Sequence, residues 1–332
     1  MTGVPDDLRT PPIDADTRTG LLRALEPLGP VTGLTQLAGG MFATSVRVDL
    51  ADGRRVVAKT APAQEDSLLR YEHDLIRTEA LVYAEAVDDP ALLMPRPLLT
   101  DFSREHLPGD LVVATWAEGV RADSEPDLAR ATAAVRNPGV GRLMAALHRH
   151  TGEYHGYPSG PDSLRGDTWP DTLTAMIEAV LADAADWSVP VPADRVRAAL
   201  ARYREDLATV ERPALVHADL WPGNQFIDPH TGALTAVIDP ERAFWGDPLF
   251  DLIGCDPFRP DVDPNLAAGY REAGGDLPLD RPEIRRRLAF CRVYLALIMR
   301  VEVRPRRYQG DWLPGYLVQI EDMLRAGLDD LD

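Results

Sequence analysis

The feature that most restricts the fold of this chain is a polar loop between two apolar runs in its second half. Residues 215–228 read LVHADLWPGNQFID, and residues 234–241 read LTAVIDPE. Asp219 and Asn224 stand five positions apart in a segment that an intervening Pro-Gly pair turns sharply. We therefore expect both side chains to point into one cleft. Asp239 ends an apolar run typical of a strand, and we expect it to face the same place.

The residue types in this loop indicate a particular chemistry. Two aspartates and one asparagine supply hard oxygen ligands and one base, the set needed to hold magnesium on a polyphosphate and to orient a hydroxyl. The alternative is that these side chains only cap turns, as Asp and Asn commonly do. Three of them at this spacing, with a lysine upstream, favour the chemical interpretation.

Lys59 is the only lysine in the chain, whereas arginine occurs 34 times. A chain that uses arginine wherever a cation suffices is expected to keep lysine where a guanidinium does not fit. The ammonium is a compact point charge that fits between phosphate oxygens, whereas guanidinium is a broad planar fork. Chance retention is the alternative, and the surrounding sequence argues against it.

The sequence around Lys59 predicts a run of antiparallel strands. Residues 44–50 alternate polar and apolar side chains, Asp52-Gly53 is a typical hairpin turn, and residues 54–60 form a β-branched run. Upstream, Gly39 and Gly40 stand where a strand must bend. This is the order of a nucleotide-covering loop followed by the strand that carries a phosphate-binding lysine.

The motif His217-x-Asp219-x-x-x-x-Asn224, with Ile238-Asp239 downstream, resembles the aminoglycoside phosphotransferase and fructosamine kinase superfamily of small-molecule kinases. The DLWPGN wording is similar to the fructosamine kinases, and GDPLFDL at 246–252 is similar to the aminoglycoside branch. The resemblance covers roughly residues 35–255. It implies an α+β, protein-kinase-like fold with two lobes. We expect a small β-rich N-lobe over 1–115 and a larger, mostly helical C-lobe over 116–332.

The resemblance also implies site roles. Asp219 is expected to face the substrate hydroxyl as the catalytic residue, while Asn224 and Asp239 bind Mg²⁺. Lys59 is expected to contact the phosphates of ATP or GTP.

The expected partner of Lys59 is a glutamate on the first helix of the N-lobe. Glu79 follows it by 20 residues, and Glu72 and Glu85 are rivals on the same predicted helix.

Other nucleotide contacts follow from the same resemblance. Gly39, Gly40 and Ser45 belong to the nucleotide-covering loop and the strand after it. Residues 111–119 resemble the hinge between the lobes, with the main chain near Thr115 and Ala117 reading the base edge. An ordinary core strand is the alternative for that segment.

Three departures from the protein kinases favour a small-molecule kinase. Ala218 stands where protein kinases carry the arginine that senses a phosphorylated activation loop, and where this superfamily commonly has glycine. Only about eleven residues separate Asp239 from Asp251, too few for such a loop. The full glycine motif of protein kinases is also missing. We interpret His217 as structural, and Asp247 and Asp251 as supports of the loop and of the helix after it.

The expected function is therefore ATP- or GTP-dependent O-phosphorylation of a small hydroxylated molecule, with an antibiotic or another secondary metabolite as the first hypothesis. A sugar, ketosamine or amino alcohol is the alternative acceptor, and antibiotic resistance and metabolism are not separable at this level. From another class, a pseudokinase could hold nucleotide without turnover. A metal-dependent hydrolase built on His217 lacks a second histidine–carboxylate cluster.

Composition restricts the partners. With a net charge of −18, nucleic acid and anionic membranes are disfavoured, because phosphate surfaces need basic protein. Cys255 and Cys291 lack metal or redox spacing, and the first residues lack the regions of a signal peptide, so we expect a cytoplasmic enzyme. The oligomeric state stays open.

The remaining sequence predicts mostly helices. One is expected over 126–150 with a break near Asn137-Pro138-Gly139. The others are expected at 12–28, 168–185, 193–210, 264–273, 282–303 and 314–328.

Overall fold

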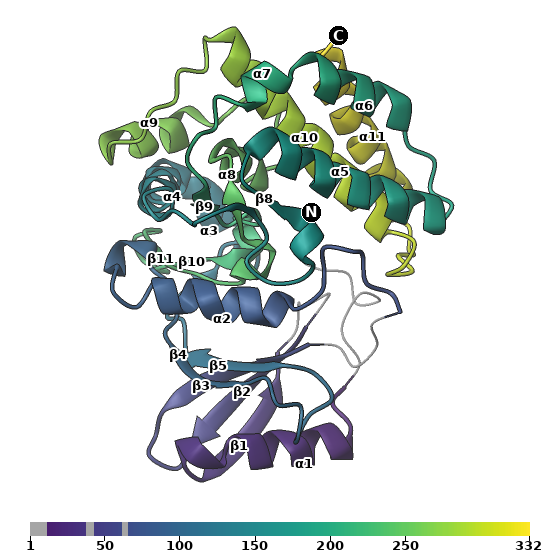
Figure 1. Cartoon of the computed structure of the whole chain (residues 1–332). Coiled ribbons are helices and arrows are strands. Elements are labelled where there is room, and N and C mark those ends of the chain that lie inside the picture. The colour runs from purple at the N-terminus through teal and green to yellow at the C-terminus, as the bar shows by residue number, and fades with distance from the viewer. Residues whose placement is uncertain (1–11, 38–42, 62–65) are drawn as a thin grey trace. The chain divides into compact units, whose positions relative to one another are not determined.

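The computed structural model describes residues 12–37, 43–61 and 66–332 and is drawn in Figure 1. The chain forms two compact units, which are treated separately below. The first unit comprises the described residues up to 66 together with 74–132 and 222–241, and the second comprises 67–73, 133–221 and 242–332. The expected single boundary after residue 115 therefore differs from the structure. Residues 222–241 join the first unit because their strand β10 (Gln225–Ile227) pairs with β6 (Val120–Arg121).

The first unit is built on a five-stranded antiparallel sheet with the strand order β1-β2-β3-β5-β4. Its strands are β1 (Val31–Gln36), β2 (Thr44–Leu50), β3 (Arg55–Thr60), β4 (Pro97–Asp101) and β5 (Leu111–Thr115). The turn between β2 and β3 is the expected Asp52-Gly53 hairpin. Gly53 has a φ of 88°, a left-handed conformation that glycine adopts without steric cost.

Helices α1 (Ala15–Ala24) and α2 (Leu75–Glu85) cover opposite faces of this sheet. Successive side chains of a strand point to opposite faces, and on β5 Leu111 and Val113 pack with α1, whereas Val112 and Ala114 pack with α2. On β3, Ala58 is in the α1 cluster. Its neighbour Lys59 therefore lies on the α2 face.

A small sheet with the order β11-β10-β6 completes the first unit, with β11 at Leu234–Val237. Strands β10 and β11 form an antiparallel pair in which Gln225 lies opposite Val237. The residues just before β10 and just after β11 are therefore at the same end of the pair. Helix α3 (Pro126–Ala131) also belongs to this unit.

The second unit is mostly helical, as expected. Its helices are α4 (Ala133–Leu147), α5 (Trp169–Asp186), α6 (Ala193–Arg202), α7 (Arg204–Leu207), α8 (Leu249–Gly254), α9 (Pro264–Glu272), α10 (Pro282–Glu302) and α11 (Leu313–Asp329). Its short strands β7 (His155–Gly156), β8 (Arg165–Gly166), β9 (Ala214–Val216) and β12 (Phe244–Gly246) form a sheet with the order β8-β7-β12-β9. Trp169, Phe244 and Phe250 pack ring against ring between sheet and helices.

The predicted break near Pro138 is wrong. Pro138 lies inside α4, and the chain breaks between α3 and α4 at Thr132 instead. A proline removes one helical hydrogen bond, and tertiary packing holds the helix here. A Cβ on Gly269 of α9 would lie 2.1 Å from the carbonyl oxygen of Pro138, so the two helices touch at this turn.

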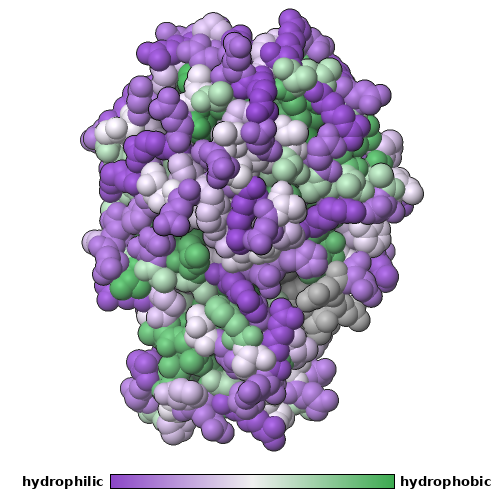
Figure 2. Space-filling model, in the orientation of Figure 1, coloured by the Kyte–Doolittle hydropathy of each residue, from purple (hydrophilic) through white to green (hydrophobic). Residues whose placement is uncertain are grey.

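Among the described residues, none of the helices is both long and apolar enough to cross a bilayer. On the face drawn in Figure 2, hydrophilic residues predominate and hydrophobic ones form separate patches.

Candidate functional site

The first half of the candidate site is a group of charged side chains around Lys59. The lysine lies between two neighbouring strands, opposite Ser45 of β2 and Val112 of β5. Its ammonium lies 2.7 Å from Glu79 Oε2 and 2.7 Å from Glu241 Oε2, and it also contacts Asp239 Oδ1. We call these four residues the lysine cluster.

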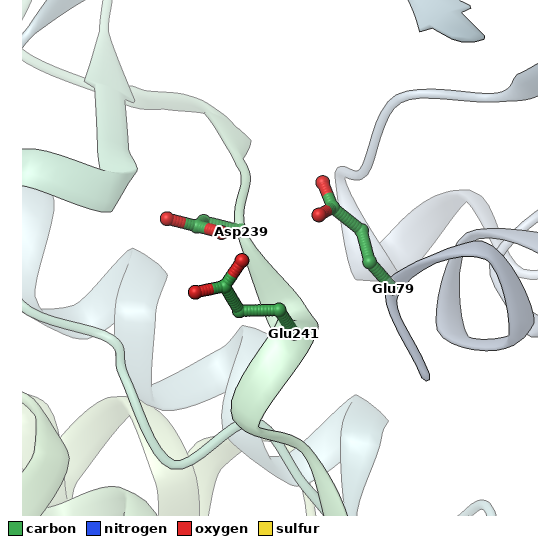
Figure 3. Close-up of side chains that lie close together, drawn as sticks. All are labelled: Glu79, Asp239 and Glu241. Atoms are coloured by element: carbon green, nitrogen blue, oxygen red, sulfur yellow. The ribbon is translucent and has the colours of Figure 1, made fainter. Parts of the chain in front are cut away.

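Each member of the lysine cluster comes from a different local structure. Glu79 is on α2, which covers the face of the sheet that Lys59 enters. Asp239 follows β11, and Glu241 lies on the single 3₁₀ turn Pro240–Arg242 after it. Figure 3 shows the carboxylates of Asp239 and Glu241 next to each other and that of Glu79 across from them, and an oxygen from each lies within 4.8 Å of the others. The side chains of Glu79 and Glu241 are buried, whereas that of Asp239 is 30% exposed.

The electrostatics of the lysine cluster are dominated by burial and by the excess of carboxylates. Burial alone lowers the pKa of Lys59, but Asp239, Glu241 and Glu79 together outweigh it, so the pKa lies well above the ordinary lysine value. Burial, reinforced by the charge of Asp239, raises the pKa of Glu241 to about 8, against the opposing effect of Lys59. Burial likewise raises the pKa of Glu79. One ammonium thus faces three acidic groups that are costly to ionise together.

Asn224 and Asp239 lie at the same end of the β10–β11 pair. Asn224 directly precedes β10, Asp239 follows β11, and the amide N–H of Ile238 donates to the carbonyl of Asn224 across 3.0 Å. Asp239 has a φ of 66°, a left-handed conformation that costs a non-glycine residue about 1–2 kcal/mol. Its amide N–H donates to the Tyr83 hydroxyl on α2, which helps to hold this bend. Such strain is typical of functional positions.

The structure shows which of the three candidate glutamates pairs with Lys59. Glu79 contacts Lys59, but Glu72 precedes α2 and is not on that helix. Glu72 is buried and pairs with Arg306 in the second unit. Glu85 is the last residue of α2. The carboxylate of Glu72 also accepts from the amide of Leu69 across 2.8 Å, and α2 begins three residues later at Leu75.

Sequence analysis did not assign Glu241 to the lysine cluster. A second acid two residues after Asp239 was a visible signal, since a single tight turn can return it to the same side.

The structure locates some of the remaining predicted nucleotide contacts, whereas others lie outside the described residues. Gly39 and Gly40 lie outside the described residues. Ser45 shares the α2 face with Lys59, directly opposite it. Thr115 ends β5, where its amide donates to the carbonyl of Arg96 across 2.9 Å, and Ala117 follows outside any strand or helix.

The second unit carries Asp219 on a strained loop. Ala218, directly before it, has a φ of 65°. The amide N–H of Asp219 donates to Nδ1 of His217, which is fully buried. A Cβ on Gly254 of α8 would lie 3.1 Å from the carbonyl of Ala218, so the loop and α8 are in close contact. These contacts give His217 a structural place in the loop.

The carboxylate of Asp251, on α8, binds the backbone of the same loop. Its Oδ1 accepts the amide of Ala218 at 2.8 Å, and its Oδ2 accepts the amide of His217 at 3.2 Å. The carboxylate is fully buried and also lies 3.0 Å from Nε2 of His148. Asp247 pairs with Arg287 of α10 through two hydrogen bonds, so both acids support the structure around the loop.

The first unit thus holds a lysine paired with a glutamate and an Asn–Asp pair at one end of a hairpin, and the second unit carries an aspartate on a strained loop. In the family comparison, a model described as the phosphotransferase enzyme family matches residues 33–290. The chain belongs to this family.

Solved structures show the same fold. An aminoglycoside phosphotransferase APH(4)-Ia variant, in a ternary complex with ADP and hygromycin B, is 22% identical with a TM-score of 0.61, covering 92% of this chain and 96% of that one. A fructosamine-3-kinase candidate from Thermobifida fusca is 21% identical with a TM-score of 0.67, covering 95% and 100%. The GDP complex of an aminoglycoside 2′-phosphotransferase variant is 16% identical with a TM-score of 0.61, covering 95% and 99%. The chain therefore has an α+β, protein-kinase-like fold. A comparison with curated protein sequences finds no match.

Proposed function

We propose that this protein is an ATP- or GTP-dependent, Mg²⁺-requiring kinase of the cytoplasm that phosphorylates a hydroxyl of a small molecule. An antibiotic or another secondary metabolite is the first acceptor class, and a sugar, ketosamine or amino alcohol is the second. The observation that carries the proposal is the lysine cluster. The only lysine of the chain is buried at the point where α2, β3 and the end of β11 meet.

In this proposal Lys59 binds the nucleotide phosphates while Glu79 holds it in place. The 2.7 Å contact with Glu79 and the burial of both side chains support these roles, because a desolvated ammonium keeps its charge and its direction. Ser45 lies directly opposite Lys59 on the same face of the sheet, which supports a role for it at the same phosphates.

The donor set fits magnesium. Carboxylate and amide oxygens are the ligands that Mg²⁺ takes, and the three acids of the lysine cluster exceed the single ammonium. We assign Asn224 and Asp239 as the residues that would hold the ion, with Glu241 adjoining them. The ion would supply positive charge to the polyphosphate, and its charge would make the ionised form of Glu241 less costly.

The nucleotide base is assigned to the main chain after β5. The amide of Thr115 is already used by Arg96, so the contact to the base falls on the carbonyl of Thr115 or on Ala117. Related structures contain adenine or guanine nucleotides, ADP and AMP-PNP in one enzyme and GDP in another. Both ATP and GTP therefore stay in the proposal.

Asp219 is assigned to the acceptor hydroxyl, which it orients and whose proton it accepts. Hygromycin B, bound in the APH(4)-Ia complexes, supports a hydroxylated acceptor. Within the basic run Arg304-Pro305-Arg306-Arg307, the guanidinium of Arg306 pairs with Glu72 and Glu302, so we do not assign it to an acidic acceptor.

The test is nucleotide consumption with and without a panel of hydroxylated acceptors, analysed by transfer of phosphate to the acceptor rather than to water. Phosphorylated product from any panel member supports the kinase. Nucleotide binding without transfer to any acceptor or to water, unchanged by Asp219→Asn, would instead identify a pseudokinase.

A further inference from the structure

Three side chains from three helical segments line up beneath the loop that carries Asp219. His148 directly follows α4, Asp251 is on α8, and Tyr270 is on α9. Nε2 of His148 lies 3.0 Å from Asp251 Oδ2, and Nδ1 lies 2.8 Å from the Tyr270 hydroxyl. Both ring nitrogens of one histidine are therefore engaged, one by an acid and one by a hydroxyl.

Asp251 determines which side of the ring must carry a proton. Its carboxylate is fully buried and already accepts two loop amides. A histidine nitrogen that faced this carboxylate with its lone pair would repel it, so Asp251 favours a proton on Nε2, and a donor on the far side of the ring adds to that preference. Loss of that donor would leave a buried charge short of one hydrogen bond, which is costly in a dry interior.

In a neutral imidazole, a proton on Nε2 leaves Nδ1 as an acceptor. The Tyr270 hydroxyl is in position to donate to it. Burial, with the charges of Asp251 and Asp247 nearby, raises the pKa of Tyr270, so the hydroxyl keeps its proton. The direction of the hydrogen bonds is then fixed along the whole row, from hydroxyl to imidazole to carboxylate.

The tyrosine is held rigidly enough for this role. A Cβ on Gly275 would lie 2.1 Å from Cε1 of the Tyr270 ring, so the backbone of Gly275 packs against the ring. The close contact between Gly269 and Pro138 sets the spacing of α9 from α4, the helix that His148 follows. The hydroxyl position is thus determined by backbone packing rather than by a mobile side chain.

We propose that Tyr270 is a positioning residue that keeps the proton of His148 on Nε2, and thereby keeps Asp251 bonded to the amides of His217 and Ala218. The left-handed Ala218 directly precedes Asp219, so this row of hydrogen bonds sets the direction of the proposed catalytic carboxylate. The consequence for catalysis rests on the proposed function, whereas the hydrogen-bond row does not.

The decisive variant is Tyr270→Phe, which removes one oxygen and keeps the ring. Nitrogen-15 NMR of histidine-labelled protein reads the tautomer, and the His148→Gln variant assigns the signal. We expect a single Nε2–H tautomer in the parent and a mixture of the two tautomers in Tyr270→Phe. A parent ring already protonated on both nitrogens, or the same tautomer in both proteins, overturns the proposal.

A double-mutant cycle separates this role from simple packing. Glutamine at 148 offers an amide donor to Asp251 that needs no tautomer, so Tyr270→Phe should matter only when His148 is present. Hydrogen exchange at the amides of 217 and 218 should speed up on the order of tenfold in Tyr270→Phe, and hardly at all in the His148→Gln background. Equal acceleration in both backgrounds would mean that Tyr270 acts by packing alone.

Two further measurements complete the design. Tyr316→Phe on α11 is the matched control, since it removes a buried tyrosine hydroxyl from the same unit and should leave exchange at 217 and 218 unchanged. Slow hydrolysis of Mg·ATP by the same variants tests the catalytic consequence. Hydrolysis should fall with amide protection, whereas a parent without any turnover counts against the proposed function and leaves the tautomer result standing.

Discussion

Lys59 and Glu241 are 182 positions apart in the chain and meet as a 2.7 Å ion pair. The contact brings a third acid to the lysine beside Glu79 and Asp239. The site around this lysine is therefore more acidic than the motif spacing indicated, and its charge balance leads to the first two predictions.

Lys59→Arg should abolish most phosphotransfer while the fold remains intact. A guanidinium keeps the charge but does not fit as a point donor among three carboxylates and the nucleotide phosphates. We expect turnover to fall on the order of 10²–10³-fold. Arg23→Lys, an exposed exchange on α1, is the control and should be neutral. Turnover of Lys59→Arg within about twofold of the parent would remove the lysine from the site.

Glu241→Gln should change how stability depends on pH. The folded pKa of about 8 lies above the ordinary value of 4.5, so the folded protein binds an extra proton between these values. The stability that comes from this group is present below pH 4.5 and is lost as the pH rises through about 8. Relative to the parent, Glu241→Gln should therefore gain up to about 1.4 kcal/mol per pH unit in this window. Urea unfolding from pH 5.5 to 8 measures it, and parallel curves would contradict it.

Asp239→Ala should abolish Mg²⁺-dependent nucleotide binding, and Asn224→Ala should raise the Mg²⁺ concentration needed. Calorimetric titration of nucleotide at several Mg²⁺ concentrations separates the two effects. Asp228→Ala is the control, because Asp228 caps a turn at the opposite end of the same hairpin. Unchanged affinity and activity in Asp239→Ala would exclude it as a metal ligand.

Asp219→Asn should lose transfer by about 10²–10⁴-fold, the usual contribution of a positioned base. Nucleotide affinity should stay close to the parent value, because the proposed nucleotide contacts are made by the lysine cluster and the main chain after β5. Single-turnover transfer and nucleotide affinity are measured on one preparation. Substantial transfer by this variant would mean that another carboxylate, with Glu241 the first to test, serves as the base.

Ala218→Gly should stabilise the protein by about 0.5–1 kcal/mol. The left-handed conformation costs alanine about 1–2 kcal/mol, and the greater freedom of glycine in the unfolded chain offsets part of the gain. Ala198→Gly, in the exposed middle of α6, should instead destabilise by about 1 kcal/mol. Thermal unfolding of both variants checks the difference, and two losses of equal size would show that the loop strain is small.

The sequence was sufficient to predict those elements whose structure depends on residues close together in the chain. The hairpin at Asp52-Gly53, the strands beside it and the long helices of the second unit follow from local patterns and turn residues. The position of Asn224 and Asp239 at one end of two short antiparallel strands follows as well.

The features that the sequence did not predict depend on contacts between residues that are far apart in the chain. Glu72 pairs with Arg306, which lies 234 positions away in the chain, rather than with Lys59. Pro138 stays inside α4 because the backbone of α9 packs against it. The row from Tyr270 to Asp251 joins three segments whose spacing in the sequence carries no periodic signal.

The burial of the single lysine also gives the protein a built-in chemical reporter. Amine-reactive reagents attack an exposed, unprotonated amine, and folded Lys59 is neither exposed nor easily deprotonated. Apart from an α-amine, the chain has no other primary amine to modify. The rate of labelling at this one position therefore reports how often Lys59 becomes exposed. A bound nucleotide that keeps the lysine cluster closed would lower that rate.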